Sequence, residues 1–190
     1  MRLHAGFHPP ESPFPAAKVV DWISVPLGVA TLRDQFSGVA DDAARYALMS
    51  WFFEENLSEF APYKDAQSRE GFQIVGTSGT VTTVAASHLG LRRYDRTKVD
   101  GLRMSSDQIE TVIRRYLEMG PAGRRRDPRI GQDRQALIMS GAAILQALLR
   151  LWPTDRLSVA DRGLREGLLM EMMVADGVWR RRDPTRNTGT

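Results

Sequence analysis

A turn of glycine, threonine and serine at residues 76–80 constrains the fold more than any other feature of this sequence. The run before it, Phe72–Val75, is mostly apolar and too short for a helix, which predicts a buried strand. The run after it, Val81–Leu89, is rich in alanine and is followed by Gly90, which is typical of a buried helix with a C-terminal glycine. A strand that leads through a short turn into a helix is a building unit of α/β folds.

The same turn is the strongest candidate for a binding site. Glycine lets the backbone approach an anion closely, and the start of the next helix presents free N–H groups and the positive end of its dipole. We predict that phosphate binds at the residues of this turn, which are Gly76, Thr77, Ser78, Gly79 and Thr80. The turn lacks the lysine of a Walker A loop and the third glycine of a dinucleotide fingerprint. The alternative is a tight turn that needs glycine for steric reasons only.

The rest of the chain also alternates between strands and helices. Val19–Val25 and Leu157–Ala160 are predicted strands, and Asp41-Asp42 and Ser105-Ser106-Asp107 are predicted helix caps. Three strands separated by helices predict an α/β layer fold. We expect an irregular proline-rich segment at 1–17, one domain at 18–176 and a basic tail at 177–190.

The spacing of glycine, proline and apolar residues also predicts one helix end and two buried helix faces. Gly120-Pro121 is expected to end a helix, and the arginine-rich stretch Ala122–Arg129 to be exposed. The helix after Asp41-Asp42 carries apolar residues on one face, which are Ala44, Leu48, Trp51, Phe52 and Leu57. The last helix is expected to turn four apolar residues inward, which are Leu164, Leu168, Leu169 and Met172.

Composition excludes several classes of protein. The 190 residues contain no cysteine, which excludes a disulfide framework, thiolate zinc sites and a cysteine nucleophile. His4 and His8 lack a third ligand, so no metal site is predicted within the chain. No apolar run approaches the roughly 18 residues of a membrane span, and we expect a cytoplasmic protein without a membrane partner.

The charge pattern favours an anionic ligand. The net charge is +3 and the isoelectric point is near 9.6, with arginine runs at Arg124–Arg126 and Arg180–Arg182. Guanidinium groups match phosphate geometry, although such runs are also common on ordinary solvated surfaces. Nucleic acid is an unlikely partner because the aromatic residues are predicted on apolar helical faces rather than interleaved with arginines.

Four motifs occur in a shared order and spacing: Val75–Thr83, Tyr94–Arg96 with Val99–Gly101, Gly141–Leu145, and Val159–Gly167. In these motifs the chain resembles the Ppx/GppA family of exopolyphosphatases and guanosine pentaphosphate phosphohydrolases, from about Val19 to Met173. The resemblance implies the second domain of an actin-like (sugar kinase and Hsp70-like) fold, with the active site in the cleft between two domains. It implies polyphosphate or guanosine pentaphosphate as substrate and magnesium as cofactor. Arg129 and Arg134 would contact the polyanion.

The chain also departs from the family pattern. The family's first phosphate loop, its water-activating carboxylate and a loop of the type Asp-Ile-Gly-Gly-Gly-Ser have no counterpart here. We therefore expect a C-terminal part that is incomplete at its N-terminus, assign no catalytic residue, and place the magnesium ligands outside this chain. Asp161 and Glu166 are expected to be ion-paired scaffold rather than a replacement base.

Whether the chain is an enzyme stays open at this point. The first hypothesis is a phosphoanhydride hydrolase domain that is inactive alone, and the alternative is a stand-alone phosphate- or polyanion-binding regulatory module. Apolar surface left uncovered by a missing half would favour self-association, so a homodimer is expected as one state.

Overall fold

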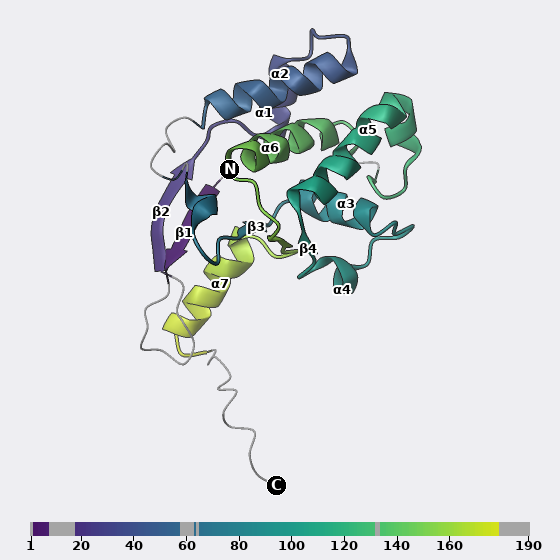
Figure 1. The fold of residues 1–190 in the computed structure, drawn as a ribbon. Helices are drawn as coiled ribbons and strands as arrows, with labels where there is room; N and C mark the ends of the chain where they lie inside the picture. Colours follow the sequence, from purple (N-terminus) through teal and green to yellow (C-terminus); the bar gives the residue numbers. More distant parts are fainter. Residues whose placement is uncertain (1, 8–17, 58–62, 64, 132–133, 179–190) are drawn as a thin grey trace.

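The computed structural model describes residues 2–7, 18–57, 63, 65–131 and 134–178 (Figure 1). In chain order the elements are β1 (Arg2–Phe7), β2 (Lys18–Ser24), α1 (Val29–Gln35), α2 (Asp42–Glu55), the short 3₁₀ helix η2 (Ala66–Ser68), β3 (Ile74–Gly76), α3 (Gly79–His88), α4 (Arg96–Val99), β4 (Arg103–Met104), α5 (Ser106–Arg126), α6 (Ile138–Leu151), β5 (Leu157–Val159) and α7 (Leu164–Ala175). No helix in the described part of the chain is long and apolar enough to cross a membrane.

The strands form two separate sheets. The larger sheet has the order β3-β5-β4, with β3 parallel and β4 antiparallel to β5. Together with its helices it confirms the predicted α/β class. The strands β1 and β2 pair antiparallel with each other. The expectation of an irregular segment is therefore wrong for residues 2–7, because β2 supplies backbone partners that no local pattern reveals. Residues 8–17 and 179–190 lie outside the described residues.

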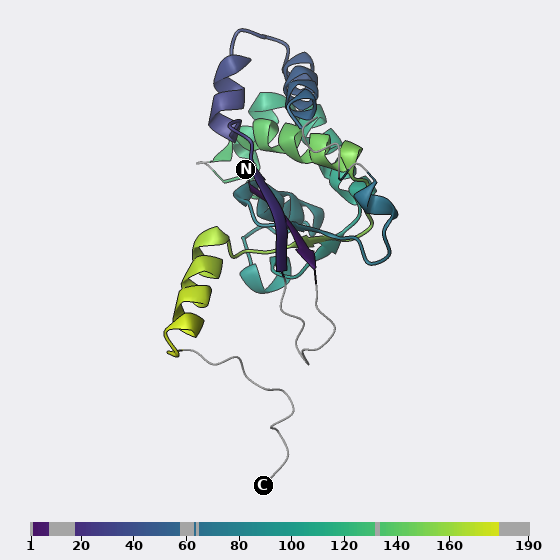
Figure 2. The ribbon, with the colours of Figure 1, turned by 90° about the vertical axis from the view of Figure 1, so that its left-hand side faces the viewer.

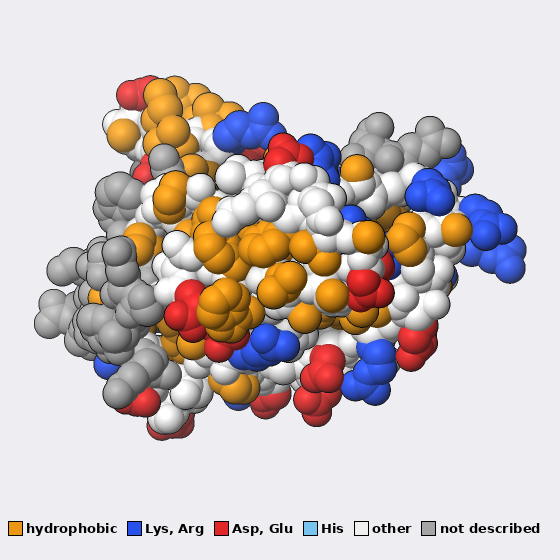
Figure 3. Space-filling view, turned by 90° about the horizontal axis from the view of Figure 1, so that it is seen from above, with side chains coloured by type: hydrophobic (Ala, Val, Ile, Leu, Met, Phe, Trp, Pro, Cys, Tyr) orange, Lys and Arg blue, Asp and Glu red, His pale blue; other side chains and the backbone are white. Residues whose placement is uncertain are grey.

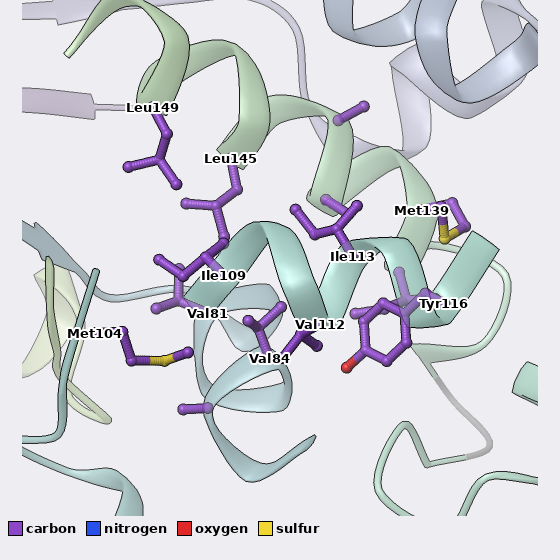
Figure 4. Packing of buried hydrophobic residues seen from close by; sticks show 14 of the residues in the cluster. Val81, Val84, Met104, Ile109, Val112, Ile113, Tyr116, Met139, Leu145 and Leu149 are labelled. Carbon is purple, nitrogen blue, oxygen red and sulfur yellow. The ribbon is translucent and has the colours of Figure 1, made fainter. Parts of the chain in front are cut away.

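The helix α6 is the centre of the core. It lies against α2 on one side and against α3 and α5 on the other (Figures 1 and 2). Ala142 and Ala143 of α6 are fully buried, and Leu145 points toward Ile109 of α5 (Figure 4). The dense apolar sequence of α6 needs cover on both sides, and this packing provides it.

The predicted caps are present, and the helix end predicted at Gly120-Pro121 is followed directly by a second helical segment. The Asp41 carboxylate accepts from the Ala44 N–H, and Ser105 forms a capping box with Gln108; such caps each contribute about 1 kcal/mol. Gly120 has φ 60° and a non-helical conformation, so the first helical segment of α5 ends there as predicted, and a second segment follows from Pro121 to Arg126. A glycine followed by proline can start a new helical segment because proline suits the first turn.

The kink in α5 folds part of the arginine run inward. Arg124 is only 4% exposed, and it donates to the Tyr116 carbonyl at 2.7 Å and to the Asp42 carboxylate at 2.8 Å. The expectation that Ala122–Arg129 is exposed is therefore wrong at Arg124. Sequence pattern cannot show a partner that lies 82 positions away in the chain.

Two predicted apolar faces are only partly buried. On α2 the core-facing residues are Tyr46, Met49, Ser50 and Phe53, whereas Leu48 is 41% and Trp51 is 56% exposed. The face seen from above, which includes α2, carries gathered hydrophobic side chains between charged ones (Figure 3). The four α7 residues predicted to face inward are all exposed.

Candidate phosphate-binding site

The turn between β3 and α3 is built from two tight contacts. A Cβ at Gly76 would lie 2.9 Å from both methyl groups of Val81, so glycine is required there for steric reasons. The Ser78 hydroxyl caps α3 by accepting from the Val81 N–H at 3.3 Å. The steric alternative from the sequence therefore explains Gly76. It does not explain Gly79 in the same way, because the atoms nearest to a Cβ there belong to the guanidinium of Arg134, starting at 3.3 Å.

The turn leaves backbone donors available. Thr77, Ser78 and Gly79 are exposed, and the N–H groups of residues 77–80 donate to no other residue in the described part of the chain. These N–H groups stand at the positive end of a ten-residue helix. Thr80 differs from its neighbours in one respect. Its side chain packs against α6, since a Cβ at Gly141 would come within 2.8 Å of the Thr80 methyl. Thr80 can therefore offer its backbone more readily than its hydroxyl.

Arg134 lies directly against this turn. It donates from Nη1 to the Gly79 carbonyl at 3.2 Å and to the Thr83 hydroxyl at 2.8 Å. It is exposed, and no carboxylate of the described residues pairs with it. A guanidinium carries five N–H donors, so others stay free for an anion. The structure thus brings Arg134 and the predicted turn together.

Arg129 has a different environment. It forms a two-pronged ion pair with Asp127, with both N···O distances at 2.7 Å. Burial raises the pKa of the Asp127 carboxyl, but the hydrogen bonds and charge of Arg129 lower it by more, and the net pKa is below its usual value. The hydrogen bond to Asp127 raises the pKa of Arg129 in turn. The charge of Arg129 is therefore compensated within the chain.

Tyr94 and Asp161 complete the surroundings of the turn. The Ala160 N–H donates to the Gly76 carbonyl at 2.8 Å, so the segment after β5 lies beside the turn after β3. Asp161 pairs with Arg96 at 3.0 Å. Partial burial, followed by a hydrogen bond to Asp161, raises the pKa of the Tyr94 hydroxyl, and Arg134 lowers it by a smaller amount. Tyr94 was not predicted as a site residue, although its position in a motif beside three arginines was an available signal.

Three motifs that are far apart in the sequence therefore meet at one edge of the sheet. The model of the Ppx/GppA phosphatase family matches residues 14–175. The chain belongs to this family. No curated protein matches it.

Solved Ppx/GppA structures show the same domain. The Aquifex aeolicus family member is 29% identical with a TM-score of 0.71, and covers 84% of this chain. The type II variant of that phosphatase is 30% identical with a TM-score of 0.69. An exopolyphosphatase from Cytophaga hutchinsonii, at 20% identity and a TM-score of 0.68, shares the fold. This Ppx/GppA chain spans about half the length of each of these proteins: it covers 50%, 50% and 51% of their chains, in the order given above. It is an α/β domain of the actin-like type.

The carboxylates near the turn of this Ppx/GppA domain are already engaged. Asp161 is held by Arg96, and its own N–H donates to the Asp100 carboxylate at 2.9 Å. The Glu166 carboxylate accepts from the Gly163 N–H at 2.8 Å, and hydrogen bonds from backbone N–H groups lower its pKa. Asp161 thus has the expected ion pair, whereas Glu166 caps the start of α7.

The family resemblance implies magnesium, and the described residues offer no site for it. Among them, no group of three His, Asp or Glu side chains lies close enough to hold a metal ion. Because Asp161 and Glu166 are engaged with Arg96 and Gly163, they are also poor ligands. The donor set in the described part of the chain therefore does not fit magnesium.

Proposed function

We propose that this chain is the phosphate-binding half of a phosphohydrolase of the exopolyphosphatase or guanosine pentaphosphate type. The turn at Gly76–Thr80 would bind phosphate groups of the polyanion through its backbone N–H groups, and Arg134 would add a charged donor. The observation that carries the proposal is that, among the described residues, four N–H groups at the start of α3 have no acceptor and the guanidinium that lies against them has no carboxylate partner. The helix N-terminus and the guanidinium are both positive, so an anion bound between them stabilises this arrangement.

The same geometry supports binding without turnover by this chain alone. Hydrolysis of a phosphoanhydride requires a water molecule aligned with the breaking bond and neutralisation of the phosphoryl oxygens. The turn and Arg134 can orient phosphate and offset its charge. Of the described carboxylates near the turn, Asp161 is ion-paired and the pKa of Glu166 is lowered, so neither is a free base. Magnesium and its ligands would be supplied from outside this chain.

A regulatory binding module is the second candidate. The observation that favours it is the engagement of both nearby carboxylates, Asp161 and Glu166, which leaves a site suited to holding an anion. In this case the chain would bind polyphosphate and never take part in its hydrolysis.

The first test combines binding with turnover. Isothermal titration of the full chain with tripolyphosphate and with guanosine pentaphosphate measures affinity, and phosphate release in magnesium buffer measures activity. Saturable binding of either ligand without release is expected. The Arg114→Gln variant serves as a control for general charge, because Arg114 is exposed and pairs only with Glu110 on the same helix. No binding of either anion would overturn the proposal, and release of phosphate by the chain alone would show that it contains its own base.

A further inference from the structure

A pocket lies at the end of the larger sheet that is away from the Gly76–Thr80 turn. Its walls come from two segments, residues 67–72 before β3 and residues 153–156 before β5. Because β3 and β5 are parallel, the segments that precede both strands lie at one end of the sheet, and the turn that follows β3 lies at the other. The pocket has a volume of about 370 Å³, which is in the range of small-molecule sites. It is therefore separate from the phosphate-binding turn.

Hydrogen bonds hold both walls of the pocket in place. The Phe72 N–H donates to the Arg69 carbonyl at 3.1 Å, and Gly71 between them has φ 77°, a conformation that favours glycine. On the other wall, the Ser106 hydroxyl donates to the Thr154 carbonyl at 2.9 Å and accepts from the Thr154 N–H at 2.9 Å. A pocket between two fixed loops is preformed, which lowers the entropy cost of binding a ligand.

The pocket carries charges of both signs that are not paired with each other. Arg69 and Glu70 line one wall, and Asp155 and Arg156 line the other. None of these four side chains forms an ion pair or a hydrogen bond with a residue in the described part of the chain. A polyanion in this pocket would meet two carboxylates as well as two guanidinium groups. The lining is therefore complementary to a ligand that carries one negative and one positive group.

The pocket also contains an acceptor that lacks a donor. The Gln67 Oε1 is buried and has no hydrogen-bond partner among the described residues. Such an acceptor costs free energy, which a donor brought by a ligand would recover. No hydrogen bond from the described residues holds this side chain, so the amide can turn its oxygen toward a ligand. The N–H groups of Glu70, Gly71 and Asp155 likewise donate to no described residue and stay available for a carboxylate.

Phe72 and Pro153 supply the apolar part of the lining. Phe72 is half-buried and packs against the core, so packing fixes its position. A phenyl ring beside a proline favours a ligand with an aromatic side chain, because aromatic pairs gain more than the area that they bury.

We propose that this pocket binds a free amino acid with an aromatic side chain. Arg69 and Arg156 would hold its carboxylate. Glu70 and Asp155 would hold its ammonium group, with the Gln67 oxygen as a further acceptor. The binding of an amino acid at this end of the sheet does not require phosphate at the turn, so either proposal can fail without the other.

The experiment is a titration of the full isotope-labelled chain with L-phenylalanine, followed by its amide NMR signals. The signals of Gly71 and Asp155 should shift in a saturable manner, whereas those of the Gly76–Thr80 turn should not. Two analogues test the need for both charges, because 3-phenylpropionate lacks the ammonium group and phenethylamine lacks the carboxylate. Each analogue should bind about tenfold more weakly or worse, since hydrogen bonds to a charged group are lost.

Removal of one guanidinium tests the pocket itself. Arg156→Gln should weaken L-phenylalanine binding about tenfold, because a charge-assisted hydrogen bond to the carboxylate is lost. Arg114→Gln is the matched control, since Arg114 is exposed and, among the described residues, pairs only with Glu110 on its own helix. Arg156 is exposed as well, so both variants should fold. The affinity of Arg156→Gln for tripolyphosphate should equal that of the parent chain.

The proposal is overturned when the Gly71 and Asp155 signals stay unmoved up to the solubility limit of L-phenylalanine. It is also overturned when Arg156→Gln binds L-phenylalanine as tightly as the parent chain. Equal binding of 3-phenylpropionate would make the pocket a plain anion site, and a shift of the same two signals by tripolyphosphate would assign it to the polyanion. A failure of tripolyphosphate to bind at the turn changes none of these readings.

Discussion

Arg134 and Gly79 are joined by a 3.2 Å hydrogen bond from the guanidinium to the carbonyl oxygen of the first residue of α3. The same nitrogen donates to the Thr83 hydroxyl at 2.8 Å. Both acceptors are neutral, and no carboxylate among the residues that the structure describes pairs with this positive charge, which lies beside the positive end of a helix dipole. This arrangement positions a charged side chain at the turn, where an anion would relieve the repulsion.

Removing the charge of Arg134 tests the proposed phosphate-binding site directly. Arg134→Gln should weaken tripolyphosphate binding about tenfold or more, because a hydrogen bond to a charged group contributes about 1.5–3 kcal/mol. The thermal unfolding midpoint should change little, since Arg134 is exposed. Calorimetric titration measures the affinity, and Arg114→Gln provides the reference for lost surface charge. Equal affinities for the Arg134 variant and the parent chain would remove Arg134 from the site.

The stability of the chain should fall when a single methyl group is added at Gly141, where α6 contacts the start of α3. Gly141→Ala places a Cβ within 2.9 Å of the Thr80 side chain and should destabilise the chain by about 1–3 kcal/mol. Urea unfolding measures the change. Thr80→Ala removes atoms that clash, so the double variant should recover part of the loss. Gly38→Ala is the control, because nothing lies within 4 Å of its added Cβ. Purely additive losses would contradict the contact.

The buried Arg124 of α5 should contribute more to the free energy of unfolding than the exposed arginines next to it. Arg124→Ala removes the buried donor to the Tyr116 carbonyl and leaves the Asp42 carboxylate with Arg45 as its remaining donor, which should cost about 3 kcal/mol of unfolding free energy. Arg125→Ala, at an exposed position, should change it by less than about 0.5 kcal/mol. Guanidinium denaturation of both variants gives the comparison. Similar losses at the two positions would mean that Arg124 is not held inside the fold.

The ion pair between Asp127 and Arg129 should make stability depend on acid pH. The net pKa of Asp127 is lower in the folded chain than in the unfolded chain, where it is about 3.9. Its stabilising contribution is therefore complete above the unfolded pKa and is lost as the pH falls through the lower folded pKa. In urea unfolding, Arg129→Gln should be clearly less stable than the parent at pH 7, and the gap should shrink toward pH 3. A constant gap at both pH values would contradict this role.

Local patterns in the sequence accounted for much of the fold. Ser105 and Asp41 were predictable as caps because each acts within three residues of itself. The turn between β3 and α3 was also predictable, since a strand, a glycine-rich turn and a helix follow one another directly. The helix end at Gly120 was predicted correctly, but the helical segment after it was not, because glycine followed by proline suits both a helix end and a new helical start.

Contacts between distant segments could not be read in the same way. Arg129 and Arg134 look alike in sequence, but Asp127 neutralises the first, and the second reaches across 55 positions to Gly79. Tyr94 is placed beside the turn through its interactions with Asp161, Arg134 and Thr82, which only the fold brings together.

The sequence by itself determined the order of strands and helices, their caps and the family motifs, because each depends on neighbours in the chain. Only the tertiary structure decided which of the two arginines pairs with a carboxylate among the described residues, that Arg124 alone of its run is buried, and that the apolar α7 faces outward. Burial and pairing depend on which distant segments meet, and the apolar pattern of Leu164, Leu168 and Met172 is the same whether or not another surface covers it.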